Sequence, residues 1–486
     1  MESQFRVIVI GAGVAGLAAS HCLQRAGIDH VVLERRSEIA PPEGASITVF
    51  PHVLRVFNQL GCMKALFDAG TLHDRAWTRW ADGSVAQNSG LYDYIKENHG
   101  IDVLPLERRV FLQVVYDNLP DKTKIRTSAA VKNITETATG VEITLADGTI
   151  EKGSMVLGCD GVHSLSRSIM WDHAASTTPN PIPKTDKTAF KTYWKCLLGV
   201  GPRAPSLGRS DSAIVHNSGH SFLILAQPHC SFFFVFFHLD KHFAASDRIR
   251  YTDADAEALA ATVANQPITE SLTFGDLWKD RARGTLISLE EGILQRWHHG
   301  RIVLAGDAVH KMTPNIALGG NTAIEDIVHL TNNLHRLLSH TPKPSLDDLT
   351  AVFSEYNTSR LPRIKFATDT SGLMSRVQAQ TTPIHKALAW IMPWLPDRGA
   401  ADMLLGEYIR KGPVLNFVPV PVPGAGEGVE RGRLRWGDEE EMEKAVVEGK
   451  KGKGGEGKVK GVVVTVVAAF GVAAVVQGVR NVLFAF

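Results

Sequence analysis

The chain has 486 residues, 44% of them hydrophobic and 21% charged, with a formal net charge of +1. This length allows two or three domains, and the near-neutral charge, without a basic stripe interleaved with aromatic residues, argues against nucleic acid as a partner. The five cysteines are scattered without CxxC spacing, which argues against a disulfide scaffold or a metal site and favours a reducing compartment.

The N-terminal segment has the pattern of a nucleotide-binding turn. Residues 6–10 are expected to form a buried parallel strand and residues 17–26 a helix, with Gly11, Gly13 and Gly16 in the turn between them. Gly11 permits the tight turn, Gly13 lets the backbone approach a pyrophosphate, and Gly16 lets the helix pack closely on the strand. The N-terminus of the helix would offer amide hydrogens and the positive end of its dipole to the phosphates.

The next elements supply two candidate partners for the nucleotide. A second strand, residues 30–34, ends at Glu34, at the distance expected for an acceptor of a ribose hydroxyl. Residues 51–60 have helical apolar spacing, and residues 77–84 are typical of a hairpin. A helix then begins near Arg108. An arginine at that position opposes the helix dipole and therefore indicates a negatively charged partner.

The middle of the chain is rich in predicted strands. Residues 131–145 and 148–156 indicate a β-meander, which is followed by a buried strand that ends at Asp160 and by a polar-capped helix. Residues 188–289 alternate as in an antiparallel sheet, with the clearest pair of strands within residues 222–238. Such a sheet could wall a pocket, and its many phenylalanines suit an apolar substrate, although core packing explains any one of them.

A second glycine–acid pair follows a buried strand in the last third of the chain. Residues 301–310 contain a strand that runs into Gly306 and Asp307. Residues 311–321 form a loop, and a long amphipathic helix follows through residues 324–337.

The C-terminal region differs in composition. Residues 383–396 contain Trp390 and Trp394, and they either touch a membrane surface or pack on the domain. Residues 424–460 indicate a mobile tether. Residues 461–479 lack charge, and as a helix they would span about 28 Å, near the ~30 Å of a bilayer core. A strand or an aggregation-prone tail is the alternative, but the preceding lysines favour a single-pass membrane protein with a cytosolic catalytic part, at the endoplasmic reticulum.

Three motifs stand in a characteristic order: GAGVAG near the start, CDGVHSLSR in the middle and RIVLAGDAVHKMTP later. With these motifs, residues 5–380 resemble the FAD-dependent aromatic-hydroxylase-like monooxygenases. Within that superfamily, HCLQRAGIDHVVLERR, PPEGASI and GDAVHKMTPNIALGGNTAIED look like the fungal enzymes of meroterpenoid and indole-diterpene biosynthesis. Many of those relatives epoxidise a prenyl chain, and they commonly carry hydrophobic membrane segments.

The resemblance implies a role in FAD binding for several residues. It places Glu34 on the adenosine ribose, Thr48 in the loop beside the flavin and Arg108 near the phosphates or the ribityl chain. It places Asp307 on the ribityl chain or pyrophosphate, and Gly320 in the loop that faces the isoalloxazine. Backbone amides at the start of the helix there would point at the flavin edge where negative charge accumulates on reduction.

Further residues match the family pattern or depart from it. The resemblance implies that Asp160 helps to bind FAD and the transient nicotinamide nucleotide, and that Arg167 is a candidate phosphate contact. Thr48 stands where relatives usually have glycine, and Leu318 adds bulk in a run that is GQGAN-like in relatives, so both bear on flavin movement. His216 stands where several relatives have tyrosine and is the candidate catalytic residue; a polar core or surface residue is the alternative.

The resemblance also implies the fold class, which is α/β. A Rossmann-like FAD-binding domain with an inserted antiparallel β-sheet substrate domain is expected, followed by C-terminal helices and a C-terminal transmembrane helix. The predicted division is the FAD-binding domain with its β-meander at 1–187, the substrate domain at 188–290, the rest of the FAD-binding domain with the C-terminal helices at 291–410, a flexible linker at 411–460 and the transmembrane helix at 461–479.

The function implied is that of an FAD-dependent monooxygenase. NADPH or NADH would be the transient reductant, and one oxygen atom from O₂ would epoxidise an alkene of a lipophilic, prenylated intermediate in secondary metabolism. One glycine fingerprint, not two, fits an FAD held permanently and a nicotinamide nucleotide that only visits. Three alternatives stay open: a hydroxylase or Baeyer–Villiger enzyme acting on an aromatic or polyketide substrate, a flavin-dependent dehydrogenase or prenyl reductase, and a non-catalytic, membrane-tethered flavin-binding scaffold.

Overall fold

The computed structural model describes residues 5–41, 46–176, 179–244, 247, 249–420, 430–440 and 443. The chain divides into a first unit, Met1–Gly437, and a second unit, Asp438–Phe486. All the helices and strands named below belong to the first unit. The predicted domain boundaries remain predictions.

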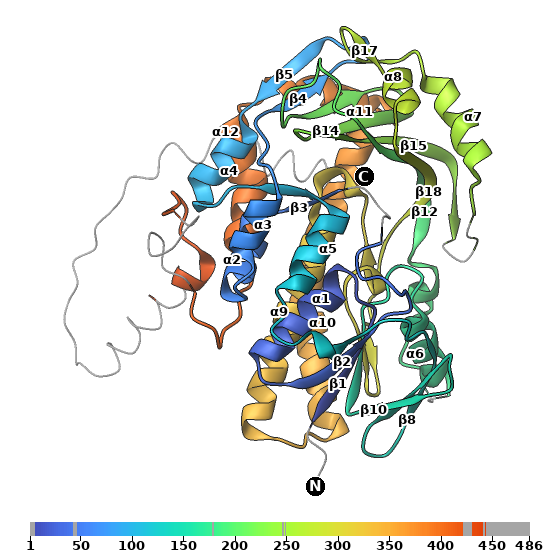
Figure 1. Cartoon of the computed structure of the whole chain (residues 1–486), viewed down its shortest axis with the longest axis vertical. Helices are drawn as coiled ribbons and strands as arrows, with labels where there is room; N and C mark the ends of the chain where they lie inside the picture. The colour runs from blue at the N-terminus through green and yellow to red at the C-terminus, as the bar shows by residue number, and fades with distance from the viewer. Residues whose placement is uncertain are drawn as a thin grey trace, which may run out of the picture. The chain divides into compact units, whose positions relative to one another are not determined.

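A mostly parallel sheet carries the predicted glycine turn (Figure 1). Within the described residues, six strands lie side by side in the order β19 (His298–His299), β20 (Ile302–Leu304), β11 (Met155–Gly158), β1 (Arg6–Ile10), β2 (Asp29–Leu33) and β7 (Ile125–Arg126). Four of the five strand pairs are parallel, and β19 runs antiparallel to β20. The sequence of β1, RVIVI, has no polar alternation because the strand is covered on both faces. The predicted strand at residues 6–10 is confirmed.

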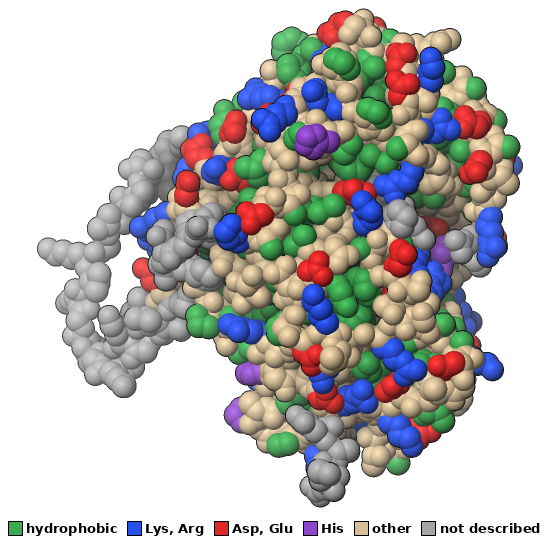
Figure 2. All heavy atoms as spheres, viewed as in Figure 1, with side chains coloured by type: hydrophobic (Ala, Val, Ile, Leu, Met, Phe, Trp, Pro, Cys, Tyr) green, Lys and Arg blue, Asp and Glu red, His purple; other side chains and the backbone are tan. Residues whose placement is uncertain are grey.

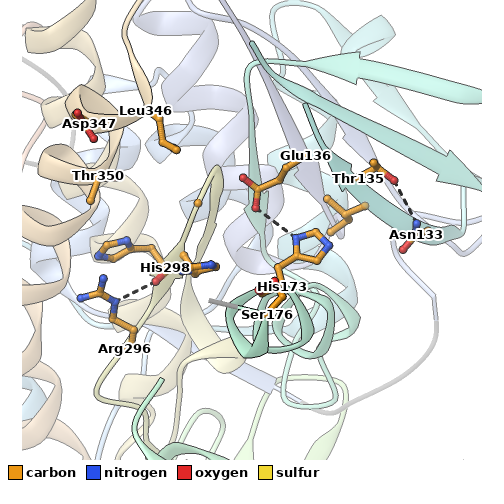
Figure 3. Close-up of a pocket in the computed structure, with 13 residues that line it drawn as sticks. Asn133, Thr135, Glu136, His173, Ser176, Arg296, His298, Leu346, Asp347 and Thr350 are labelled. Atoms are coloured by element: carbon orange, nitrogen blue, oxygen red, sulfur yellow. Dashed lines mark hydrogen bonds and ion pairs between the residues drawn. The ribbon is translucent and has the colours of Figure 1, made fainter. Parts of the chain in front are cut away.

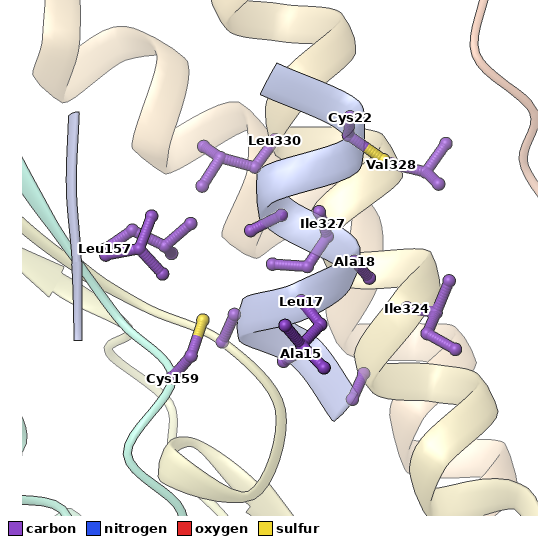
Figure 4. Close-up of a cluster of buried hydrophobic side chains, with 14 of the residues drawn as sticks. Ala15, Leu17, Ala18, Cys22, Leu157, Cys159, Ile324, Ile327, Val328 and Leu330 are labelled. Atoms are coloured by element: carbon purple, nitrogen blue, oxygen red, sulfur yellow. The ribbon is translucent and has the colours of Figure 1, made fainter. Parts of the chain in front are cut away.

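Helix α1 (Val14–Arg25) covers this sheet and packs on helix α9 (Leu318–His340). Figure 4 shows Leu17 of α1 in the main buried cluster together with Leu157 of β11 and Ile327 of α9. The helix begins at Val14, three residues earlier than predicted, because the Gly13 backbone already serves as its N-cap. The sheet and α1 therefore present the glycine turn on a rigid, buried base.

Two smaller sheets are formed by strands that lie between the strands of the central sheet in the chain. The predicted β-meander is present as β10 (Ile150–Gly153), β9 (Val141–Leu145) and β8 (Val131–Glu136), with an additional turn between β8 and β9. A two-stranded ladder joins β3 (Ser46–Val49) to β6 (Leu104–Glu107). This ladder matters for the site because it brings the residues before helix α5 (Arg108–Asp117) next to those before helix α2 (Pro51–Gln59).

The predicted antiparallel sheet is present and is larger than residues 188–290. Eight strands of the described chain are ordered β21 (His310–Lys311), β18 (Arg283–Ile293), β12 (Lys191–Gly201), β15 (Ser231–Ala244), β14 (His220–Ala226), β13 (Ser212–His216), β4 (Ala76–Arg79) and β5 (Val85–Ser89). The expected pairs β14–β15 and β4–β5 are confirmed. The latter hairpin joins the sheet through a parallel pairing of β4 with β13, which no local pattern reveals.

Helices α7 (Asp253–Val263) and α8 (Phe274–Lys279) cover one face of this sheet and were not predicted from the sequence. Both begin with a capping box, Thr252 with Asp255 and Thr273 with Asp276. Between them lies the short pair β16 (Pro267–Thr269) and β17 (Leu272–Thr273).

The remaining helices surround the two large sheets (Figure 1). Their bounds are α2 (Pro51–Gln59), α3 (Met63–Ala69), α4 (Leu91–His99), α5 (Arg108–Asp117), α6 (Leu165–Ala175), α10 (Leu346–Gln378), α11 (Pro383–Ile391), α12 (Asp397–Ala400) and α13 (Glu407–Arg410).

In the described part of the chain, no helix combines the length and the apolar character needed to cross a membrane. The two longest helices, α9 and α10, carry ion-paired charges such as Glu325, Asp326 and Arg360. On this finding the predicted C-terminal transmembrane helix is wrong, and so is the single-pass membrane location with a cytosolic catalytic part at the endoplasmic reticulum. The segment on which both rested, residues 461–479, lies outside the described residues.

Part of the segment predicted as a flexible linker is packed on the first unit. The backbone N–H of Leu434 donates to the carbonyl oxygen of Asn98 at 2.9 Å, and Trp436 is buried beneath the Arg55 guanidinium, which lies 4.0 Å from the indole centroid. Leu415 is also buried and exchanges hydrogen bonds with the side chain of Gln59. These contacts are long-range, so composition alone could not reveal them.

On the face shown in Figure 2, acidic and basic side chains are mixed with apolar ones and no large area of one charge is visible. This mixture accords with the net charge of +1.

Candidate functional site

The three glycines of the N-terminal turn differ in what a side chain would meet at each position. Gly11 has φ +98°, and a Cβ there would lie 2.7 Å from the carbonyl oxygen of Cys159. A Cβ at Gly16 would lie 1.8 Å from the carbonyl oxygen of Gly11. A Cβ at Gly13, in contrast, would meet only the Arg108 Nη2, at 3.9 Å. The fold therefore requires Gly11 and Gly16, whereas the space beside Gly13 is a cradle for something other than protein.

Glu34 follows the last residue of β2 and contacts this turn directly. Its Oε2 accepts a hydrogen bond from the backbone N–H of Ala12 at 2.8 Å, and its Oε1 accepts one from Arg36 at 2.9 Å. The carboxylate is buried, and each oxygen still has acceptor capacity. Its predicted role as the acceptor of a ribose hydroxyl stays a prediction.

Thr48, Arg108 and Gly320 approach the same turn from three further elements. The β3–β6 ladder contains Thr48 and ends where α5 begins with Arg108. A Cβ at Gly320, in the first turn of α9, would lie 2.9 Å from Ile47 Cδ1 and 3.8 Å from Val14 Cγ1. The structure thus brings together the glycine turn, Glu34 and these three predicted residues.

Asn321, which was not predicted as a site residue, joins the start of α9 to β3. Its side-chain amide donates to the carbonyl oxygens of Thr48 and Ala317, each at 2.8 Å, and its Oδ1 accepts from the backbone N–H of Phe50 at 3.0 Å. Ala317, the N-cap of α9, has φ +55° and ψ +24°, in the left-handed region. An asparagine just after two glycines at a helix start was the available signal.

Asp307 lies in the short turn after β20 and forms an ion pair with Lys311. Burial lowers the pKa of Lys311, but the Asp307 carboxylate more than offsets this effect, so the pKa lies above its usual value. Arg108 is close enough to Lys311 to act on the same pKa. Two cations, Arg108 and Lys311, therefore lie near Asp307 and Gly13. Lys311, like Asn321, was not predicted from the sequence.

A buried charge network, hereafter the Asp326 network, is hydrogen-bonded to the backbone of this turn. Asp326 Oδ2 accepts a hydrogen bond from the backbone N–H of Gly306 at 3.0 Å and lies 2.6 Å from His310 Nε2. Its Oδ1 accepts from Arg360 Nε at 2.8 Å. Burial raises the pKa of Asp326, but His310 and Arg360 hold it below its ordinary value. Gly306 has φ +62°, so the network fixes a glycine turn that precedes Asp307.

The neighbouring carboxylate, Glu325, extends this charge network towards α2 and α10. Its oxygens lie 3.0 Å from His52 Nε2, 2.7 Å from Arg360 Nη1 and 2.6 Å from Arg363 Nη2. Burial acts to raise the pKa of Glu325, but the two arginines hold it well below its ordinary value.

The side chains of Asp160 and Arg167 form hydrogen bonds to other parts of the chain. Asp160 accepts hydrogen bonds from Ser164 Oγ at 2.5 Å and from the backbone N–H of Ser166 at 2.9 Å, at the start of α6. Arg167 is buried and donates to the carbonyl oxygens of Ala308 at 2.8 Å and Val162 at 2.7 Å. The Asp160 backbone lies beside Gly11. Their predicted nucleotide contacts remain predictions, while the observed bonds support the turn that contains Asp307.

His216 lies on β13 of the eight-stranded sheet, and the backbone N–H of the next residue, Asn217, donates to the carbonyl oxygen of Gln378. The side chain of Gln378 in turn accepts a hydrogen bond from Asn315, in the loop before α9. The His216 ring is buried and stands edge-on to Trp80, with centroids 6.0 Å apart. Burial lowers its pKa to about 4, so the imidazole is neutral at physiological pH. Within the described residues its Nδ1 has no hydrogen-bond partner. The predicted catalytic role stays a prediction.

A polar surface pocket of about 670 Å³ lies elsewhere, between β8, α6, β19 and the start of α10 (Figure 3). Glu136 accepts a hydrogen bond from the Arg301 backbone there and lies 3.3 Å from His173 Nδ1, while His298 is buried against Ser354. None of the residues predicted for the site lines this pocket.

Comparison with known proteins gives one family. Residues 4–371 match the family described as FAD binding domain. The FAD-dependent monooxygenase DEP2 of Alternaria brassicicola is 38% identical over 443 residues, which cover 90% of this chain and 82% of the relative. The FAD-dependent monooxygenase spyC of Aspergillus fumigatus is 35% identical over 428 residues, which cover 87% of this chain and 89% of the relative.

A solved structure shows the same fold. Klebsiella pneumoniae HpxO complexed with FAD and uric acid superimposes with a TM-score of 0.68 at 20% identity, covering 85% of this chain and 98% of that chain. The α/β FAD-binding fold expected from the three motifs is thereby confirmed. The chain belongs to the FAD binding domain family and, within it, to the fungal FAD-dependent monooxygenases.

Proposed function

We propose that this FAD-dependent monooxygenase uses NADPH or NADH and O₂ to epoxidise an alkene of a lipophilic, prenylated intermediate in secondary metabolism. The relatives at 35–38% identity are named FAD-dependent monooxygenases, which supports the reaction class. The substrate class is carried by one observation, the apolar character of one face of the eight-stranded sheet.

That face, hereafter the inner face, is the one not covered by α7 and α8. Side chains alternate along the strands, so Phe222 and Val235 pack beneath α7 and α8, whereas Leu223 and Phe234 point to the opposite side. The end of α10 contacts the sheet, and the residue that follows it, Ala379, belongs to the cluster on that opposite side. The buried residues of the inner face are Trp194, Cys196, Leu223, Leu225, Phe232, Phe234, Phe236 and Leu289, with Ala379 from the residue after α10. A wall of this composition suits a hydrocarbon chain and offers few partners to a polar ligand.

FAD fits the residues around the glycine turn. The open cradle at Gly13 and the unblocked N-terminus of α1 suit the pyrophosphate, and Glu34 suits the adenosine ribose. Arg108 and Lys311 supply positive charge near the same place, with Asp307 as an acceptor for a ribityl hydroxyl. When bound, FAD would supply the activation of O₂ that the chain's own side chains cannot perform.

The chain's residues would bind, orient and exclude water. Gly320 and Asn321 hold the first turn of α9 beside Val14 and β3, so backbone amides there would stabilise negative charge on a reduced flavin edge. The inner face would hold the alkene and keep water out. Neutral His216 could orient a polar group of the substrate by a hydrogen bond from or to its ring.

The test is product analysis with ¹⁸O₂. Purified protein with FAD, NADPH and a prenylated phenol or indole is expected to yield an epoxide carrying one ¹⁸O atom, with NADPH consumed in equal amount. Fragmentation of the product separates an epoxide from an alcohol and from an inserted ester. An alcohol or ester would reject epoxidation, and substrate oxidation without ¹⁸O would reject monooxygenation of that substrate.

A further inference from the structure

We propose that α11 and the turn after it bind the interfacial layer of a lipid bilayer, lying on the membrane without crossing it. The surface concerned, hereafter the tryptophan face, consists of five large apolar side chains between residues 384 and 395. Their exposed fractions are Ile384 55%, Trp390 63%, Ile391 47%, Trp394 77% and Leu395 53%.

The concentration of these side chains is unusual for the molecule. Among the described residues twelve large hydrophobic side chains are exposed, and these five fall within twelve consecutive positions. The other seven are scattered over the fold; Ile150 and Leu346 are examples. Single exposed apolar residues need no explanation, but a contiguous group marks a binding surface.

The local structure turns the apolar side chains outwards. Thr382 caps α11 by accepting a hydrogen bond from the backbone N–H of His385 at 3.2 Å, and Pro383 occupies the first turn. Ala389 is fully buried on the side where α11 meets α10, while Ile384 and Ile391, seven positions apart, lie on the outer face. A helix that packs through a small residue and exposes its large apolar ones is reversed relative to an ordinary surface helix.

The chemistry of the face favours lipid over protein. Lys386 carries the only formal charge between Thr381 and Pro396. The first acid beyond, Asp397, is turned towards β5, since its oxygens accept hydrogen bonds from Gln87 Nε2 at 2.7 Å and the Gly90 backbone at 3.0 Å. A face with a positive charge and no negative one suits anionic head groups.

The two tryptophans suit the interfacial layer of a bilayer. In the described part of the chain neither the Trp390 nor the Trp394 indole N–H has a hydrogen-bond partner, so each could donate to a lipid carbonyl or phosphate. Helix α11 has nine residues, or about 14 Å, which is far less than the ~30 Å of a hydrocarbon core. The contact is therefore interfacial.

The tryptophan face also continues from the inner face of the large sheet. The carbonyl oxygens of Gln378 and Ala379, at the end of α10, accept hydrogen bonds from the backbone N–H groups of Asn217 and Gly219, in the β13–β14 turn. Helix α11 begins four residues later. A substrate dissolved in the bilayer would thus lie near the sheet that we propose to receive it. This last step rests on the proposed function, whereas the membrane contact does not.

Quenching of tryptophan fluorescence by brominated lipid tests directly whether the two tryptophans lie in the bilayer. Full-length, FAD-loaded protein is mixed with vesicles of phosphatidylcholine and phosphatidylserine, with and without brominated phosphatidylcholine. Tryptophan emission of the bound protein is expected to fall in brominated vesicles. The variant W390F/W394F keeps the apolar area but lacks these fluorophores, so at equal bound fraction its loss of emission should be several-fold smaller. Equal quenching in both proteins, or none in either, would overturn the proposal.

Affinity provides the second measurement. The variant W390S/W394S should bind the same vesicles about tenfold or more weakly, because two large apolar side chains no longer leave water. The matched control I150S/L346S, which removes two exposed apolar side chains elsewhere, should bind as the unchanged protein does. Vesicle affinity unaffected by W390S/W394S would contradict the proposal. A dimer that W390S/W394S converts to monomer, without vesicle binding by either protein, would assign the face to self-association instead.

Discussion

At the scale of single residues, Glu34 holds the glycine turn in place through both oxygens of its carboxylate. One oxygen accepts the Ala12 N–H inside the glycine turn, and the other accepts the Arg36 N–H at the end of β2. The side chain therefore fixes the turn, and we propose that it also accepts a hydrogen bond from the adenosine ribose of FAD. A substitution there would remove both a support of the turn and the proposed ribose acceptor.

Replacing Glu34 by alanine should raise the Kd for FAD by about 10- to 100-fold, the usual cost of a lost hydrogen bond to a charged group. Titration of the apoprotein with FAD measures this. Glu38→Ala removes an exposed acid four residues away and should leave the Kd unchanged. An unchanged FAD affinity in Glu34→Ala would reject the ribose role.

Ala317 occupies a backbone conformation that suits glycine. Its φ of +55° lies in the left-handed region, which costs a residue with a Cβ roughly 1–2 kcal/mol. Glycine avoids this cost, but its greater conformational entropy in the unfolded chain offsets part of the gain. Ala317→Gly should therefore stabilise the protein by about 0.5–1 kcal/mol, seen as a higher urea midpoint. Ala387→Gly, inside α11, should have the opposite sign. A lower midpoint for Ala317→Gly would show that the alanine packs there in a way that offsets the strain.

At the scale of elements, the Asp326 network joins α9, α10 and β21 behind the Asp307 turn. All its side chains are buried, and each carboxylate oxygen of Asp326 has a partner. Removing one partner from such a network leaves a buried charge uncompensated, which costs far more than an exposed ion pair contributes. The network is the reason that the Gly306–Asp307 turn is held in one position.

Asp326→Asn should destabilise folding by about 3–5 kcal/mol, because Arg360 would lose one of its two carboxylates in a fully buried position. Urea unfolding of the FAD-loaded protein measures the change. Asp68→Asn, which breaks the exposed pair with Lys64, is the matched control and should change little. Equal midpoints for the two variants would show that the network adds nothing to stability.

Local patterns predicted the elements that form locally. The glycine turn, the hairpin β4–β5 and the pair β14–β15 follow from spacing and turn residues, and all are present. Long-range partners were missed because no short segment encodes them. Arg167 bonds to Ala308, 141 positions away, and Asn321 bonds to Thr48, 273 positions away. The helices α7 and α8 were missed although their capping boxes were readable.

At the scale of the whole molecule, several histidines are buried in neutral form. Burial lowers the pKa of His73 to about 4 and the pKa of both His99 and His298 to about 3. These folded-state values lie below that of the unfolded chain, near 6.5. Below about pH 6.5 the unfolded chain therefore takes up protons that the folded one does not, and stability falls.

The free energy of unfolding should thus decrease between about pH 7.5 and pH 5.5, by up to roughly 1.4 kcal/mol per pH unit for each such histidine. Within the described residues neither ring nitrogen of His99 has a hydrogen-bond partner, so phenylalanine can replace it without losing a bond. His99→Phe should flatten the pH dependence by close to one proton. Urea midpoints across this range test it, and an identical slope in the variant would contradict the assignment.

For the molecule as a whole, we propose that FAD held at the glycine turn is reduced by a nicotinamide nucleotide and then reacts with O₂. The most direct measurement is the flavin absorbance of FAD-loaded protein, followed under anaerobic addition of NADPH and then on admission of oxygen with a prenylated phenol or indole present. We predict bleaching by NADPH, recovery with oxygen and one oxygenated product per flavin oxidised. An FAD-loaded protein that neither NADPH nor NADH bleaches would contradict the account.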